Sequence, residues 1–231
     1  MIDFLKKHKK LSVILGIVAS LLLVFTYLHA LFLPGVWHNG AFLYKKDDGS
    51  FSGANEYADF VMTREKQGSI TEISFKVNDK TKTYRVVQEE NSPNVQIFEN
   101  GESIFKGTVL PMENLNLLED ENGELVDIVR ISVGGVAPKE EELFPNITEI
   151  YNFSKGETDT RGEPYMLILI VILGAILALD IAFPNLFFYF RHGLNVDGGT
   201  PSDYYRAGQM FGRVVCAIGI IACIVMTFTV R

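Results

Sequence analysis

Three long apolar stretches divide the chain, at residues 11–33, 165–190 and 212–230. The first contains no Asp, Glu, Lys or Arg, the second contains only Asp180, and the third contains only Arg213, near its start. The shortest stretch has 19 residues, which as a helix span about 28 Å, close to the roughly 30 Å hydrocarbon core of a bilayer. The pattern predicts three transmembrane helices and leaves residues 1–10, 34–164 and 191–211 in water.

Between the first two apolar stretches the hydrophobic period changes to two. Ile73, Phe75 and Val77 alternate with polar residues, as in a strand with one buried face. Asn100-Gly101 is a preferred dipeptide for the turn of a two-residue hairpin. We therefore expect residues 34–164 to form an all-β domain, an antiparallel meander of about six to eight strands that closes as a sandwich or small barrel. Strands are predicted at residues 41–46, 57–64, 73–77, 84–86, 95–99, 103–110, 124–133 and 147–153.

Positive charge near the spans predicts their orientation. Four lysines lie in residues 1–10, and three arginines lie in or beside residues 191–211, so both segments are expected in the cytoplasm. Residues 34–164, with 24 Asp and Glu against 13 Lys and Arg, are then extracytoplasmic. A cleaved signal peptide is the alternative for the first span, but 23 apolar residues exceed the about 7–15 of such a signal. We predict a multi-pass protein of the plasma membrane, with the lipid bilayer as one partner.

Composition excludes several classes of function. The chain has 231 residues, of which 48% are hydrophobic, and a net charge of −7. This apolar content argues against intrinsic disorder, and the acidic balance argues against binding of nucleic acid. Both cysteines, Cys216 and Cys223, lie in the third apolar stretch, so no disulfide framework is expected in the β domain.

The predicted β domain carries no recognisable catalytic or metal-binding pattern. His38 is its only histidine, and no Gly-x-Ser-x-Gly nucleophile motif is present. The acidic run that ends at Gly123 lacks the ligand spacing of a calcium loop. We therefore predict no catalytic residues, no metal and no cofactor, and instead a domain that binds an envelope ligand, a peptide or a membrane-protein partner.

Asp180 is the candidate functional residue within the membrane. A carboxylate in the middle of a transmembrane helix costs about 2.5–3.5 kcal/mol on insertion scales. The sequence places no Lys or Arg deep in the other spans to pair with it. One interpretation is a carboxylate that titrates or pairs with a partner. The other is a protonated acid bonded to a neighbouring helix, or a side chain that extends toward the inner surface.

Small residues recur at helical spacing along the second and third spans. Such residues let two helices approach closely in lipid. We predict a hairpin of these spans, with Asp180 off the small-residue face and directed at the first span or a partner; the alternative is a homodimer. The small residues are Gly174, Ala178 and Ala182 in the second span, and Gly208, Gly212, Cys216, Gly219 and Cys223 leading through the third.

The residues before the third span predict a helix start. Thr200 is the expected N-cap, Pro201 suits the first helical position, and the charge of Asp203 suits the third.

A group of Pro, Asn, Gly, Ser, Asp and Arg residues extends from the end of the second apolar stretch into the third. These residues are Pro184-Asn185-Leu186-Phe187, Gly193, Pro201-Ser202-Asp203, Arg206, Arg213 and Gly219. Through them, residues 165–230 resemble an uncharacterised family of membrane-hairpin domains from Gram-positive bacteria. This chain has Pro-Asn where that family has Asn-Pro. The resemblance implies a bacterial membrane location, and no activity comes with it.

The sequence thus predicts an integral membrane protein that presents an extracytoplasmic β domain and acts as a non-enzymatic binding or interaction protein. The alternative is an accessory subunit or transporter-like element of a membrane complex, which would use Asp180 and the helix bundle.

Overall fold

A computed structural model describes residues 9–112, 115–126, 138–192 and 200–229. The chain forms two compact units. The sheet unit is Leu33–Thr160, and the helical unit combines Met1–Phe32 with Arg161–Arg231. The sheet unit is therefore inserted in the sequence between helix α2 (Lys9–Leu31) and helix α4 (Pro164–Ala182).

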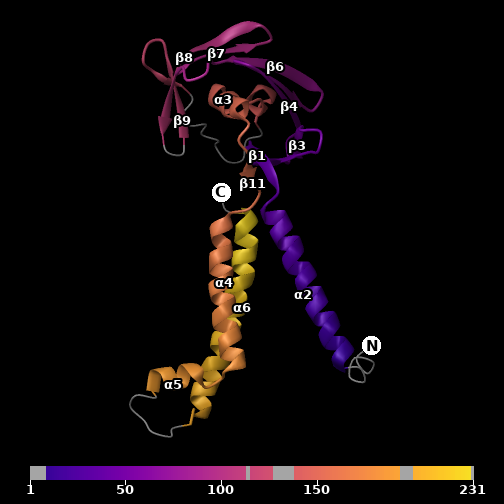
Figure 1. Cartoon of the computed structure of the whole chain (residues 1–231), viewed down its shortest axis with the longest axis vertical. Coiled ribbons are helices and arrows are strands. Elements are labelled where there is room, and N and C mark those ends of the chain that lie inside the picture. Colours follow the sequence, from indigo (N-terminus) through magenta and orange to yellow (C-terminus); the bar gives the residue numbers. More distant parts are fainter. Residues whose placement is uncertain (1–8, 113–114, 127–137, 193–199, 230–231) are drawn as a thin grey trace. The chain divides into compact units, whose positions relative to one another are not determined.

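The described part of the sheet unit contains an open antiparallel sheet of eleven strands (Figure 1). Consecutive strands pair along the sheet, and only β11 departs from this order, because it pairs with β1. The strands are β1 (Pro34–His38), β2 (Ala41–Lys45), β3 (Phe51–Ala54), β4 (Asp59–Gln67), β5 (Ile70–Val77), β6 (Lys80–Val87), β7 (Asn94–Glu99), β8 (Glu102–Met112), β9 (Leu115–Asp120), β10 (Leu125–Val126) and β11 (Asp159–Thr160).

The antiparallel meander predicted from the two-residue period is confirmed. The strands expected at 41–46, 57–64, 73–77, 84–86, 95–99 and 103–110 correspond to β2, β4, β5, β6, β7 and β8. Asn100 and Gly101 form the predicted hairpin turn with φ values of 49° and 93°, which a type I′ turn requires. Of the strand predicted at 124–133, only β10 is seen, and residues 127–133 lie outside the described residues.

The predicted closure into a sandwich or barrel is wrong, because the sheet is open. Its apolar face is covered instead by a 3₁₀-helix, η1 (Glu140–Leu143), and helix α3 (Ile147–Lys155). A helix buries the apolar face of a sheet as well as a second sheet does.

The strand predicted at residues 147–153 is also wrong, since this segment is α3. Asn146 accepts a hydrogen bond from the amide of Glu149, whose carboxylate accepts one from the amide of Asn146. This capping box starts the helix, and Gly156 ends it at φ 72°. Ile150, Tyr151 and Phe153 are buried, so the apolar residues that suggested a strand point toward the sheet from one side of a helix.

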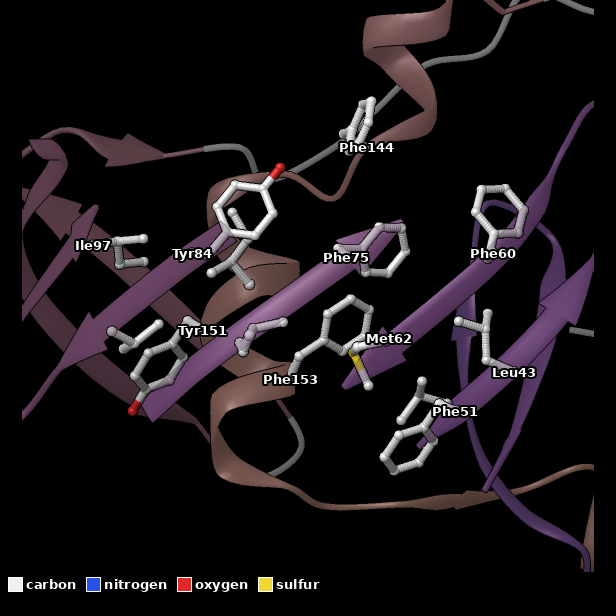
Figure 2. Packing of buried hydrophobic residues seen from close by; sticks show 14 of the residues in the cluster. Leu43, Phe51, Phe60, Met62, Phe75, Tyr84, Ile97, Phe144, Tyr151 and Phe153 are labelled. Atoms are coloured by element: carbon white, nitrogen blue, oxygen red, sulfur yellow. The ribbon is translucent and has the colours of Figure 1, made fainter. Parts of the chain in front are cut away.

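One hydrophobic core lies between α3 and the sheet (Figure 2). Phe60 and Met62 of β4 and Phe75 of β5 are at most 1% exposed. The rings of Phe75 and Phe153 stack in parallel with centroids 6.0 Å apart. Along the other face of these strands the side chains are largely exposed, as the alternating burial of β4 shows.

His38 holds the segment before α3 against the first strand. Its side chain is fully buried, and its ring packs edge-on against Phe60 and Phe75. Nε2 lies 2.7 Å from the carbonyl oxygen of Leu143 and therefore donates to it, while Nδ1 lies 3.4 Å from a carboxylate oxygen of Glu149. The only histidine of the sheet unit is thus a core residue.

The helical unit contains α2, α4, α5 (Leu186–His192) and α6 (Asp203–Thr229) among its described residues. Helices α4 and α6 are long and apolar enough to cross a bilayer, and α2 includes a shorter apolar stretch, Val18–Leu31. α4 and α6 run side by side, whereas α5 projects to one side from the end of α4 (Figure 1). The single helix predicted at 165–190 is broken after Ala182, because Pro184 lacks an amide donor and keeps the preceding Phe183 out of helical geometry.

The helices of this unit are joined where α2 and α6 end. The hydroxyls of Tyr27 and Thr227 lie 2.9 Å apart, and the amide of Gly162 donates to the carbonyl of Leu31. A Cβ at Gly162 would lie 2.6 Å from Leu31 Cδ1 and 2.9 Å from Thr227 Cγ2. A side chain at this position would require Leu31 and Thr227 to move from where the chain passes between these two helix ends.

Candidate functional site

Asp180 lies in the last turn of α4, two residues before the helix ends at Ala182. The sequence placed this residue near the middle of a longer span. Since α4 has 19 residues and a helix rises about 1.5 Å per residue, Asp180 is at one end of a segment just long enough to cross the hydrocarbon core. Its side chain is only 12% exposed, and its surroundings come from α6.

Arg213 and Gln209 of α6 bind Asp180 directly. Arg213 Nε lies 2.6 Å from Asp180 Oδ2, and Gln209 Nε2 lies 2.5 Å from Oδ1. The sequence places no Lys or Arg deep in the other spans, and the cation comes from Arg213 at the edge of the third apolar stretch. The predicted orientation of Asp180 toward the first span or a partner is wrong, because its side chain faces α6. Gln209 and Arg213 are one helical turn apart on α6, so both face the end of α4.

The same two side chains complete the hydrogen bonding of the α4 terminus. In a continuous helix, residue 184 would donate its amide to the carbonyl of Asp180, but Pro184 has none. Arg213 Nη2 donates to this carbonyl over 2.8 Å, and Gln209 Nε2 donates to the carbonyl of Pro184 over 2.7 Å. The end of α4 is therefore capped by side chains from α6, and the carboxylate is one part of that arrangement.

Some of the small residues predicted to line the hairpin face the other helix, and the others are exposed or have open space beside them. A Cβ at Gly219 would lie 3.3 Å from Leu173 Cδ1, so this glycine faces α4 closely. Cys216 and Cys223 are half-buried on the same side of α6. Ala178 and Ala182 are exposed, and a Cβ at Gly174, Gly208 or Gly212 would meet nothing within 4 Å. Leu173 and Leu177, each one position before a predicted small residue, are half-buried, and Asp180 is buried, so the inward side of the second span is displaced from the predicted small-residue face.

The start of α6 differs from the predicted cap. The helix begins at Asp203, and the hydroxyl of Ser202 accepts from the amide of Tyr205. Ser202 is therefore the N-cap in place of Thr200, and Asp203 occupies the first helical position instead of the third. The charge of Asp203 still lies in the first turn, where it favours the helix.

A recess of about 640 Å³ lies beside the Asp180 cluster, between α4, α5 and the first half of α6. Its walls are mostly apolar or aromatic, and the Asp180, Gln209 and Arg213 side chains form a polar part of the lining. Gly208 and Gly212 line it without side chains. The recess thus combines apolar surface with three hydrogen-bonding groups, as small-molecule sites do.

A second hollow, of about 680 Å³, lies on the face of the sheet opposite α3. Gln96 pairs with Lys106 across β7 and β8, and Asn94 pairs with Thr108, so these side chains point away from the buried Val95 and Ile97. Gly107 allows the close approach of β9, because a Cβ there would lie 2.0 Å from the carbonyl oxygen of Glu119. The hollow is polar and open to solvent.

The charged groups of this hollow interact with one another. Lys106 Nζ lies 2.6 Å from a carboxylate oxygen of Glu121, and this hydrogen bond and charge raise the pKa of Lys106 above its ordinary value. The amide of Glu124 donates to Asp120, which lowers the pKa of that carboxylate despite partial desolvation. Both groups therefore stay ionised at neutral pH.

Within the described ranges, no three His, Cys, Asp or Glu side chains come together to hold a metal ion. No protein-family model matches the chain, and no curated protein or solved structure is similar to it. The resemblance of residues 165–230 to a bacterial membrane-hairpin family stays a prediction.

Proposed function

We propose that this chain is an integral membrane protein that presents its sheet unit outside the cell as a non-enzymatic binding or interaction module. The apolar helices α4 and α6 support the membrane location. Four lysines before and at the start of α2 and the arginines around the α5–α6 connection favour a cytoplasmic position for those segments. The sheet unit then lies outside, because α2 precedes it and α4 follows it.

The polar hollow on the free face of the sheet is the observation that carries this proposal. Its lining offers amide, hydroxyl, carboxylate and ammonium groups on adjacent strands, including Asn94, Gln96 and Lys106. The opposite face is the hydrophobic core under α3, so the fold is stabilised without these groups. Exposed hydrogen-bonding side chains on a rigid sheet suit recognition of a polar partner, such as an envelope component or a peptide.

Affinity capture with the full-length protein tests the proposal. The double variant Gln96→Ala/Lys106→Ala removes two hydrogen-bonding groups from the hollow. The matched control Thr63→Ala/Lys76→Ala changes exposed side chains of β4 and β5 outside the hollow. We expect a partner captured from native membranes by wild type to be lost with the first variant and kept with the control. Equal capture by all three proteins would contradict the role of the hollow.

A second candidate function is an accessory subunit of a membrane complex, favoured by the Asp180–Gln209–Arg213 cluster. Polar groups in membrane helices often mark partner or transport sites. In this case the captured partner would be lost with Asp180→Asn and retained with the hollow variant, so the same experiment separates the two functions.

A further inference from the structure

We propose that the recess between α4, α5 and α6 binds one phospholipid from the surrounding bilayer, with an acyl chain on its apolar wall and the phosphate toward the arginines of α6. This inference rests on the proposed membrane location and is independent of the function of the sheet unit.

The lining of the recess has an apolar part and a part with tyrosines, which match the acyl chains and the headgroup of a phospholipid. Ile176 and Leu177 of α4 and Cys216 of α6 provide an apolar wall on the side of the hairpin. Tyr204 and Tyr205 line the opposite end, at the start of α6. Tyrosines concentrate where lipid headgroups meet water, so this end of the recess matches the headgroup level and the apolar wall matches the acyl chains.

Two glycines create the space. Gly208 and Gly212 lie one turn apart on α6, line the recess and have no atom within 4 Å of the position of a Cβ. Larger side chains would fill the groove at both positions. In a bilayer an unfilled apolar groove of about 640 Å³ is occupied by hydrocarbon, because an empty cavity forfeits van der Waals contact on every wall.

The charge of α6 suits a phosphate at the polar end. Arg213 donates to Asp180 through Nε and Nη2, while Nη1 has no hydrogen-bond partner among the described residues, and the side chain is 33% exposed. Arg206 lies seven residues earlier, on the same helix face and two turns nearer the tyrosines. A phosphodiester between these guanidinium groups would meet complementary charge.

Native mass spectrometry of the full-length protein tests this inference. The protein is reconstituted in nanodiscs of phosphatidylcholine and phosphatidylglycerol in equal amounts and released in mild detergent. Wild type is expected to retain one phospholipid. Gly212→Leu should reduce retention by at least about tenfold, the equivalent of two buried methylene groups. Gly174→Leu is the matched control, because this glycine also has open space around it but lies outside the recess.

An exposed variant guards against effects on folding. Arg206→Gln should lower phospholipid retention by about fivefold, as expected for one cationic side chain near a lipid phosphate. Absence of bound phospholipid from wild type would overturn the inference, as would equal retention by wild type and Gly212→Leu. Failure of the protein to enter nanodiscs at all would instead contradict the membrane location on which the inference rests.

Discussion

The end of α4 shows how residues on two helices share one set of hydrogen bonds. Pro184 leaves the carbonyl of Asp180 without its helical donor, and Arg213 supplies that donor while also binding the carboxylate. Each group would be costly to leave unpaired next to lipid. Asp180 and Arg213 therefore stabilise the hairpin as a pair, and each depends on the other.

Removing either partner should destabilise the hairpin. We predict that Asp180→Asn and Arg213→Gln each lower the free energy of unfolding by about 1–3 kcal/mol, because the remaining partner is left unsatisfied. The double variant should lose less than the sum of the two. Unfolding of the full-length protein in mixed micelles, followed by circular dichroism, measures all three values. Strict additivity would show that the two side chains do not interact.

The contact of η1 with the sheet should depend on acidic pH. Lys82 Nζ lies 2.9 Å from a carboxylate oxygen of Glu141, and this hydrogen bond lowers the pKa of Glu141 below its ordinary value of 4.5. A carboxylate with a lowered pKa stabilises the folded state fully above the unfolded value, and this stabilisation is lost as the pH falls through the folded value.

Hydrogen exchange of the full-length protein over residues 140–143 measures this effect. Protection should be constant near neutral pH and fall below about pH 4.5. In Glu141→Gln, protection at neutral pH should be slightly lower and the acid-induced fall smaller. An unchanged acid-induced fall in the variant would show that this ion pair has no part in holding η1.

At the scale of residues, the sequence singled out Asp180 but not its partner. Arg213 stands at the edge of the third apolar stretch, which suggested a residue at the membrane surface. The antiparallel register of α4 and α6 brings that edge beside the last turn of α4. This pairing depends on the residue at which α4 ends, and the apolar residues continue past Ala182 although the helix does not. Pro184 is the local sequence feature that indicates the end of the helix.

At the scale of elements, α3 decides how the sheet is completed. The sequence contains its capping residues, Asn146 and Glu149, and the Gly156 at its end, but residues 147–153 are predicted as a strand. Arg64 of β4 donates to the carbonyl of Ser154 through Nε and Nη2, and this contact ties the C-terminal end of α3 to the sheet. Tertiary contacts of this kind override a weak local preference.

Loss of the N-cap should weaken this helix. We predict that Asn146→Ala lowers the free energy of unfolding of the sheet unit, in the full-length protein, by about 1 kcal/mol. The control Asn152→Ala lies within the same helix, where the side chain accepts a hydrogen bond of 3.3 Å from Asn116, and alanine favours the helix. Denaturant unfolding followed by tryptophan fluorescence of Trp37 compares the two. A larger loss for Asn152→Ala would contradict the capping role.

The regular elements were predictable because their signals are local. Alternation and Asn-Gly turns defined most strands, and continuous apolar residues defined the two long helices. Four features were not predictable, since each arises where segments distant in sequence meet. They are the open edge of the sheet, the helix over its core, the polar hollow on the sheet and the recess beside Asp180. The roles of Gly107 and Gly212 can be recognised only from the atoms around them: Gly107 lies against the backbone of β9, and Gly212 has open space beside it.

At the scale of the whole molecule, the proposed function requires the sheet unit to lie outside the cell and the start of α6 to lie in the cytoplasm. The sheet unit is acidic and follows a helix that begins with lysines, whereas arginines flank the connection between α5 and α6, with Arg191 in α5 and Arg206 and Arg213 in α6. Positive charge is retained in the cytoplasm during insertion. The sheet unit and the start of α6 should therefore lie on opposite sides of the membrane.

Cysteine labelling in intact cells tests this arrangement most directly. In a full-length protein with Cys216→Ala and Cys223→Ala, single cysteines are introduced by Glu102→Cys at the start of β8 and by Thr200→Cys before α6, both at exposed positions. A membrane-impermeant maleimide should label the Glu102→Cys protein in intact cells and the Thr200→Cys protein only after permeabilisation. Labelling of the Thr200→Cys protein in intact cells, or protection of the Glu102→Cys protein until the cells are opened, would contradict the account.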